Sequence, residues 1–298
     1  VVERGRQAGV EVCLWFNPSK DNSYAHWEDD ARTLVGLFRE HGIRVFKIDG
    51  VDIPDKRADL NLRAMFERVL EETNHEVTFN LDATASRRFG YHYLNEYGTI
   101  FLANRYTDSA SYYPHWTLRN LWQLARYVPA QNLQMEFLNR WRNPDQYPAD
   151  DPLAPSKVPF DYCFAVTMAA QPLAWFEVQN LPAAGREIAP LVRAYRAVQP
   201  ELHGGCILPV GDEPDGTSWP GFQSVESPQQ GLLLVYRECN DQPAGYYRLF
   251  GTAAGERFSL TPVLGHGQAA EVEVDASGHL AVALPRPFSF ALYRYARR

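Results

Sequence analysis

Short apolar runs alternate with amphipathic stretches over residues 1–200 of this 298-residue chain, and this alternation constrains the fold more than any other feature. The apolar runs predict strands at Val10–Phe16, Ile43–Ile48, Glu76–Leu81, Thr99–Ala103, Leu133–Leu138 and Pro172–Val178. The amphipathic stretches predict helices at Trp27–His41, Ala58–Glu72, Phe89–Asn95, His115–Val128, Phe160–Ala170 and Arg186–Val198, the last of them stopped by Pro200. This repeated order of strand and helix predicts an α/β fold with a parallel sheet.

The side chains within these strands favour a barrel over a doubly wound sheet. In the second run, Lys47 and Asp49 share one face, and the apolar residues share the other. In the third run, Asn80 and Asp82 again share one face. A sheet with helices on both sides would have apolar strands throughout. Polar residues gathered at the carboxyl ends of strands fit a barrel whose site opens at that end.

The number of units is smaller than a complete barrel requires. About six βα units are present, whereas a (β/α)₈ TIM barrel needs eight, and the sequence begins with Val1 instead of Met. We therefore expect an N-terminally truncated barrel that starts just before its third strand, which leaves the cellular compartment unassigned. We also expect its open strand edges to make it prone to self-association.

The pattern changes after residue 204. Gly204-Gly205 and the loop Gly211–Gly221 are rich in turn residues. Short β-patterned runs follow at Leu232–Tyr236, Tyr246–Leu249, Arg257–Leu260, Glu271–Val274, Leu280–Leu284 and Phe288–Tyr295. We predict a barrel domain over residues 1–203 and a C-terminal antiparallel β-sandwich over residues 204–298.

Charge and motifs exclude several classes of function. A formal net charge of −7 and a pI of about 5.6 argue against nucleic acid or an anionic membrane as partner. No apolar run of ~18 residues occurs. The glycine-containing run at 265–270 lies among β-patterned residues instead of before a helix, and Asp49, Asp52 and Asp55 lack the spacing of an EF-hand. We therefore predict no cofactor and no metal.

The most specific motif is Phe46-Lys47-Ile48-Asp49-Gly50. At the carboxyl end of a barrel strand, Lys47 and Asp49 point into the site together. The lysine favours an ionised carboxylate, and such a carboxylate can attack an anomeric carbon. The alternative is a buried ion pair with a purely structural role.

A second motif, Asn104 through Asp108, follows the fourth predicted strand and precedes the helix that contains Trp116. It places Arg105 and Asp108 just beyond a strand end. Asp108 can serve as a catalytic acid opposite Asp49. It can also be an ordinary turn residue or helix N-cap, because Asp is common at both.

These motifs together resemble the α-galactosidases of the melibiase type, glycoside hydrolase family 36 and its clan. The matching segments are Trp15-Phe16-Asn17-Pro18, Phe46 through Asp49, Arg105 through Asp108, Trp116 through Asn120, and Leu138-Asn139. The similarity covers roughly residues 9–200, and a β domain follows where the family has one.

The resemblance implies a retaining hydrolase that removes terminal α-linked galactose from an oligosaccharide or glycoside. It implies that Asp49 is the nucleophile and Asp108 the general acid/base. Lys47 and Arg105 are the implied substrate contacts, and Trp15 is the implied pocket wall. Asn80 and Asp82 would face the site, although the run from Asn80 to Thr84 departs from the family's usual Cys- or Gly-rich turn. Glu177 is either another pocket carboxylate or a charge on the rim.

Three other functions remain as alternatives. A transglycosylase would replace water with a sugar hydroxyl, and acceptor-site residues would distinguish it. A sugar-binding barrel without catalysis would have lost Asp49 or Asp108, and both are present. A metal-dependent isomerase would need His ligands at several strand ends, where the sequence has none. The sequence leaves the exact sugar and the oligomeric state open.

Overall fold

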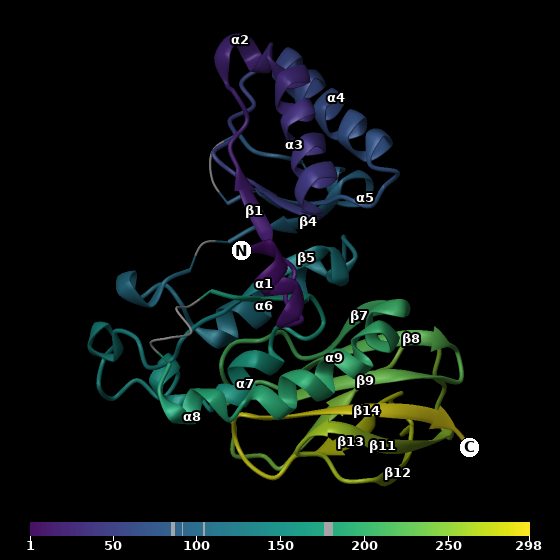
Figure 1. Cartoon of the computed structure of the whole chain (residues 1–298). Helices are drawn as coiled ribbons and strands as arrows, with labels where there is room; N and C mark the ends of the chain where they lie inside the picture. Colours follow the sequence, from purple (N-terminus) through teal and green to yellow (C-terminus); the bar gives the residue numbers. More distant parts are fainter. Residues whose placement is uncertain (85–86, 91, 104, 176–180) are drawn as a thin grey trace. The chain divides into compact units, whose positions relative to one another are not determined.

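The computed structural model describes residues 1–298 except 85–86, 91, 104 and 176–180 (Figure 1). The chain divides into two compact units. The first unit comprises residues 1–104 and 132–134, and the second comprises residues 105–131 and 135–298. No described helix is long and apolar enough to span a membrane.

The first unit alternates strands and helices along the sequence. Its strands are β1 (Cys13–Phe16), β2 (Val45–Ile48), β3 (Thr78–Asp82) and β4 (Gly98–Phe101). Its helices are α1 (Val2–Gln7), α2 (Asp21–Tyr24), α3 (Trp27–His41), α4 (Lys56–Glu72) and α5 (Tyr93–Glu96). The strands pair in parallel and in sequence order, and β4 pairs with the start of β5 (Leu133–Phe137).

The complete parallel sheet has the strand order β1-β2-β3-β4-β5-β6, where β6 is Gln171–Ala174. This six-stranded half-barrel confirms the predicted α/β class and parallel sheet. The six strands lie where the apolar runs predicted them, although each observed strand is shorter than its run. The predicted continuation of the last strand from 176 to 178 lies outside the described residues.

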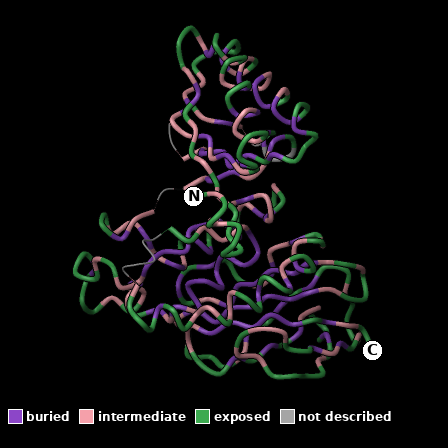
Figure 2. Tube along the Cα trace, in the orientation of Figure 1, coloured by how far each residue is buried: buried purple, intermediate pink, exposed green. Residues whose placement is uncertain are grey.

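The helices of the first unit cover the apolar side of its strands. Buried positions recur along α3 and α4 at helical spacing (Figure 2). Phe66 of α4 packs against Phe79 of β3 with ring centroids 4.7 Å apart. Phe46 and Ile48 are fully buried, whereas Lys47 between them is partly exposed. The predicted division of these strands into an apolar and a polar face is therefore confirmed.

The second unit begins with helices and short 3₁₀ turns. Its helices are α6 (Pro114–Leu124), α7 (Phe160–Ala165), α8 (Ala183–Arg186) and α9 (Ala189–Gly204). Its 3₁₀ turns are η1 (Thr107–Ser109), η3 (Pro144–Gln146) and η4 (Pro155–Lys157), and η2 (Ala130–Asn132) ends at the boundary with the first unit.

The prediction that Pro200 stops the last helix is wrong, because α9 continues through it to Gly204. A proline inside a helix removes one backbone hydrogen bond and crowds the preceding turn. Here tertiary contacts hold the final turn in place. Leu202 is fully buried, the Ser224 hydroxyl donates to the Leu202 carbonyl over 2.7 Å, and the His203 ring lies 3.0 Å from the Met168 carbonyl.

An antiparallel β region follows, as predicted. Its strands are β7 (Cys206–Gly211), β8 (Pro220–Ser227), β9 (Gln230–Arg237), β10 (Ala244–Tyr247), β11 (Arg257–Gly265), β12 (Ala270–Glu273), β13 (Leu280–Ala283) and β14 (Ser289–Arg297). One sheet has the order β12-β11-β14-β9-β8-β7, and the other pairs β10 with β13. The sequence analysis missed β7 and β8, because their glycines and prolines resembled turn signals.

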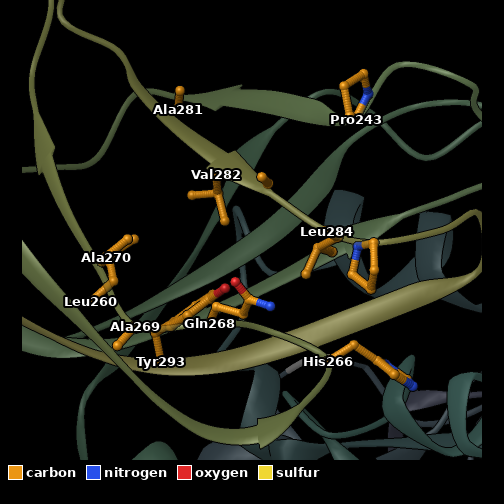
Figure 3. A pocket seen from close by; sticks show the side chains of 12 residues that line it. Pro243, Leu260, His266, Gln268, Ala269, Ala270, Ala281, Val282, Leu284 and Tyr293 are labelled. Atoms are coloured by element: carbon orange, nitrogen blue, oxygen red, sulfur yellow. The ribbon is translucent and has the colours of Figure 1, made fainter.

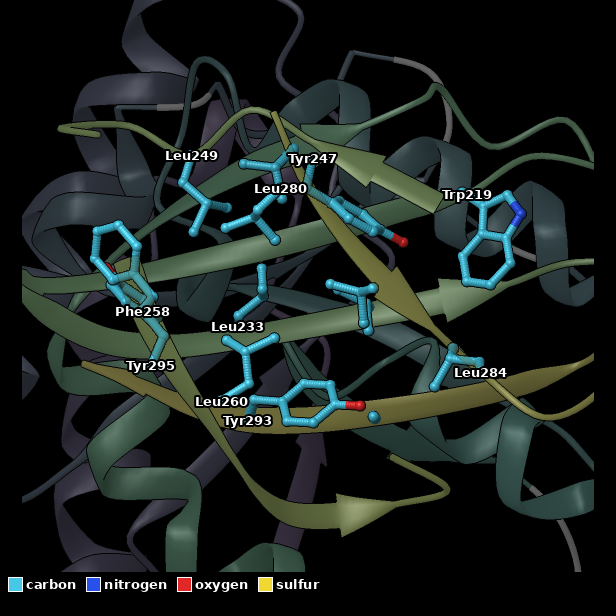
Figure 4. Close-up of a cluster of buried hydrophobic side chains, with 14 of the residues drawn as sticks. Trp219, Leu233, Tyr247, Leu249, Phe258, Leu260, Leu280, Leu284, Tyr293 and Tyr295 are labelled. Atoms are coloured by element: carbon cyan, nitrogen blue, oxygen red, sulfur yellow. The ribbon is translucent and has the colours of Figure 1, made fainter. Parts of the chain in front are cut away.

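One hydrophobic core serves both antiparallel sheets (Figure 4). Leu233 and Tyr293 come from the larger sheet, and Tyr247 and Leu280 come from the smaller one. All four are essentially excluded from solvent. Burying aromatic and leucine side chains from both sheets stabilises each sheet through the other, at about 1.5–3 kcal/mol for each fully buried side chain.

Candidate active site

Three charged side chains of the first unit meet at the carboxyl ends of β2 and β3. The Nζ of Lys47 lies 3.7 Å from Oδ2 of Asp49 and 3.9 Å from Oδ2 of Asp82. The side chains of Lys47, Asp49 and Asp82 are 21%, 17% and 5% exposed, respectively. The ammonium group therefore bridges two carboxylates that are shielded from most of the solvent.

Asp49 has further polar neighbours. Its backbone N–H donates to the Phe16 carbonyl over 3.1 Å, and the Gly50 N–H donates to its Oδ1. The Nη1 of Arg88 lies 3.9 Å from the same oxygen. Two cationic groups and one N–H thus surround the carboxylate and favour its negative charge. Arg88 was not identified from the sequence, because it lies in a loop where no periodic pattern indicates which side chains point inward.

Gly50 is required by both its backbone and its surroundings. Its φ of +65° lies in the left-handed region that side chains disfavour. A Cβ at this position would lie 2.6 Å from Oδ1 of Asn17. A glycine here therefore allows the strand end that carries Asp49 to approach Asn17 of the Trp-Phe-Asn-Pro motif.

Aromatic rings lie beside Lys47. Its Nζ is 5.4 Å from the ring centroids of both Trp15 and Phe101. Trp15 is directly opposite Lys47 in the β1–β2 register, and 72% of its surface is exposed. An exposed indole beside a group of charged side chains is suited to stack on the apolar face of a sugar ring.

Asn80 and Asp82 occupy different environments on β3. The Asn80 amide donates to Thr99 Oγ1 over 3.1 Å and to Gln134 Oε1 over 2.6 Å. Asp82 Oδ1 accepts hydrogen bonds from the N–H and hydroxyl of Thr84, which leaves Oδ2 facing Lys47. Asp82 thus joins the charged group around Lys47, whereas Asn80 links three neighbouring strands.

In the second unit, Asp108 is the central residue of the short turn η1 and is exposed. It is not the N-cap of α6, because that position belongs to Tyr113. Before it, the Tyr106 N–H donates to the Ser111 hydroxyl over 2.9 Å, and the Tyr106 ring meets the Trp175 ring edge-on at 5.5 Å. These contacts order the turn and leave its carboxylate accessible.

Arg105 lies at the start of the same loop. Its guanidinium carbon is 5.6 Å from the ring centroid of Trp116, which is itself 37% exposed. The structure therefore brings Lys47, Asp49, Asp82 and Trp15 together in one unit, and Arg105 and Asp108 together in the other. Glu177 lies outside the described residues.

Glu136 of β5 is a buried carboxylic acid that the sequence analysis missed. It is 1% exposed, and burial raises its pKa to about 7. Its own backbone N–H and the positive charge of Arg105 partly oppose this increase in pKa. Gln134 and Glu136 are two residues apart on an otherwise apolar strand, the same signal that identified Lys47 and Asp49.

We predict that Glu136→Gln makes stability less dependent on pH. The raised folded-state pKa means that ionised Glu136 destabilises the fold, by up to about 3 kcal/mol above pH 7. This cost is absent below an unfolded-state pKa of about 4.3 and grows as the pH rises to about 7. The variant should therefore gain stability relative to wild type between pH 4.5 and 8, as measured by denaturant unfolding. Parallel pH curves would contradict this, and Glu226→Gln, on an exposed site of β8, is the control.

Among the described residues, no three His, Cys, Asp or Glu side chains form a group that could hold a metal ion. A separate hollow of about 450 Å³ opens in the β region (Figure 3). Its lining is mostly apolar and includes Leu260, Val282 and Tyr293, with His266 as its titratable side chain apart from the Tyr293 phenol. It has no carboxylate in its lining, so it lacks the groups that hydrolysis of a glycoside requires.

No family model matches this sequence, and no curated protein matches it. Among solved structures, the GH36 α-galactosidase AgaA from Geobacillus stearothermophilus has a TM-score of 0.68 at 13% identity, covering 100% of this chain and 46% of that one. The galactosidase domain of the α-galactosidase–sucrose kinase AgaSK has a TM-score of 0.70 at 12% identity, covering 100% and 45%. The maltogenic α-amylase AmyB from Thermotoga neapolitana has a TM-score of 0.67 at 9% identity, covering 99% and 80%.

These similarities show that the chain has a fold found in glycoside hydrolases. The chain spans less than half the length of the two α-galactosidase chains. With identities of 9–13%, the similarity applies to the fold, and the chemistry must be argued from the residues of this chain.

Proposed function

We propose that this chain is the catalytic part of a retaining glycoside hydrolase that removes terminal α-linked galactose. The observation that carries this proposal is the environment of Asp49. Its carboxylate lies at a strand end between Lys47 and Arg88, beside the exposed Trp15. A partly buried, negatively charged carboxylate next to an aromatic surface has the properties of a glycosidase nucleophile.

The choice of α-galactosides is supported by the fold. Solved structures of AgaA contain raffinose, stachyose or 1-deoxygalactonojirimycin. The residues of this chain that resemble the family, Lys47, Asp49, Arg105 and Asp108, are the ones that we assign to the reaction. The proposed barrel domain is residues 1–203 and the proposed β-sandwich is residues 204–298, because the last parallel strand ends at Ala174 and the first antiparallel strand starts at Cys206.

In the proposed mechanism, Asp49 attacks the anomeric carbon while Asp108 donates a proton to the leaving oxygen. The C–O bond to the leaving group breaks, and a covalent glycosyl–Asp49 ester forms. Asp108, now ionised, removes a proton from water, which attacks the same carbon and releases Asp49. Lys47 and Arg105 donate hydrogen bonds to sugar hydroxyls, Asp82 accepts them, and Trp15 forms the pocket wall. Asn80 supports this surface through its bonds to neighbouring strands.

The stereochemistry of the product tests this proposal. Two inversions at the anomeric carbon restore the original configuration, so NMR of the first-formed sugar should show the α anomer. The substrate is chosen by screening the full-length protein against nitrophenyl α- and β-glycosides. Initial appearance of the β anomer would rule out double displacement, and turnover of β-glycosides alone would rule out the proposed substrate class.

A further inference from the structure

Glu136 is a buried charge without a local partner. Neither of its carboxylate oxygens accepts a hydrogen bond from another described residue, and neither has appreciable solvent-exposed area. A buried carboxylate without partners is costly, and most proteins avoid it. Its presence at the carboxyl end of β5, in a chain with a glycosidase fold, therefore calls for a specific role.

Arg105 has the complementary deficiency. Its Nε is buried and has no hydrogen-bond acceptor in the described part of the chain. Its guanidinium lies over the Trp116 ring, which restrains the group in one direction only. Arg105 and Glu136 are close enough to interact electrostatically, because the charge of Arg105 lowers the pKa of Glu136.

The other groups around Glu136 do not neutralise it. The remaining titratable neighbour with which it interacts is Tyr112, which is fully buried. Burial, followed by the charges of Cys163 and Glu136, raises the pKa of Tyr112 well above its usual value, so the phenol stays neutral. Among these described neighbours, Arg105 is the group that carries a compensating positive charge.

We propose that Glu136 is a positioning residue that holds Arg105 in place for substrate binding. Its negative charge attracts the guanidinium from within the fold, while the Trp116 ring supports the guanidinium from another side. The remaining N–H groups of Arg105 are then directed to sugar hydroxyls. This inference rests on the proposed function, because it takes Arg105 as a substrate contact.

The first test measures the pair without using catalysis. The side-chain carboxyl of Glu136 is titrated by ¹³C NMR in the wild-type protein and in Arg105→Gln. Loss of a nearby positive charge should raise the pKa of Glu136 further, by roughly one unit. An unchanged titration would overturn the pairing, whatever reaction the protein catalyses.

The second test measures the effect on the substrate. Glu136→Gln keeps the shape of the side chain and removes its charge. We expect KM for a nitrophenyl α-galactoside to rise about tenfold with kcat within about twofold, because a binding contact is lost equally in the ground and transition states. Arg105→Gln should have a similar effect, and the double variant should be no worse than either single variant. Glu136→Asp should recover part of the loss.

Three results separate the possible failures. A wild-type protein that neither hydrolyses α-galactosides nor binds 1-deoxygalactonojirimycin would refute the proposed function, while the NMR titration would still decide the pairing. An active wild type with additive effects in the double variant, or an unchanged KM in Glu136→Gln, would refute the positioning role. The control Glu226→Gln should leave KM unchanged, because its side chain is exposed on β8.

Discussion

Asp49→Asn is expected to reduce turnover of α-galactosides by roughly 10⁴-fold or more while the fold remains intact. Loss of a covalent nucleophile typically costs several orders of magnitude in rate. The amide has nearly the same shape as the carboxylate, and its oxygen can still accept the hydrogen bond from the Gly50 N–H. It cannot attack the anomeric carbon to form the ester. Lys47 retains Asp82 as a partner, so the charged group is not left unpaired.

The measurement combines steady-state kinetics with circular dichroism and thermal unfolding. Asp52→Asn is the matched control, since Asp52 lies in the same loop and forms an ion pair with Arg87 that is substantially exposed. Such pairs contribute about 1 kcal/mol or less, so the control should keep both fold and activity. If Asp49→Asn retained near-wild-type turnover, Asp49 would not be the nucleophile.

The elements that the sequence predicted best are those whose signals are local. The helix Trp27–His41 has the predicted bounds, because its apolar spacing is regular and Gly42 ends it with a left-handed φ of +70°. The first strand was predicted from residue 10 but starts at Cys13, because a strand begins where a neighbour can pair with it. Partners of this kind are set by tertiary structure and cannot be read from the apolar run itself.

The same difference applies to the candidate site. Lys47, Asp49 and Asp82 were identified because alternation along a strand decides which face each side chain occupies, and the structure brings them together. Arg88 could not be identified, because its approach to Asp49 depends on the path of a loop. Glu136 could have been identified from its alternation with Gln134. It was overlooked because β5 was interpreted as one apolar run.

Asp108→Ala is expected to affect substrates according to their leaving group. Hydrolysis of α-galactosides with sugar leaving groups should slow by roughly 10²–10⁴-fold, the usual contribution of a general acid. Substrates with a dinitrophenyl leaving group should lose much less in the first step, because that oxygen needs little protonation to depart. Asp108 is exposed on η1, so its removal should leave stability nearly unchanged. The control is Asp145→Ala on the exposed turn η3, which should leave all rates near wild type.

Azide distinguishes a lost acid/base from a general loss of binding. In the second step of a retaining mechanism, Asp108 removes a proton from the attacking water, and its loss lets the glycosyl–Asp49 ester accumulate. Azide is already an anion and needs no base, so it should attack the ester and raise turnover of the dinitrophenyl substrate, giving a galactosyl azide. A variant that lost activity equally on both kinds of substrate, without rescue by azide, would show that another carboxyl group is the acid. Asp82 is the next described candidate, because its Oδ2 already faces Lys47 beside Asp49.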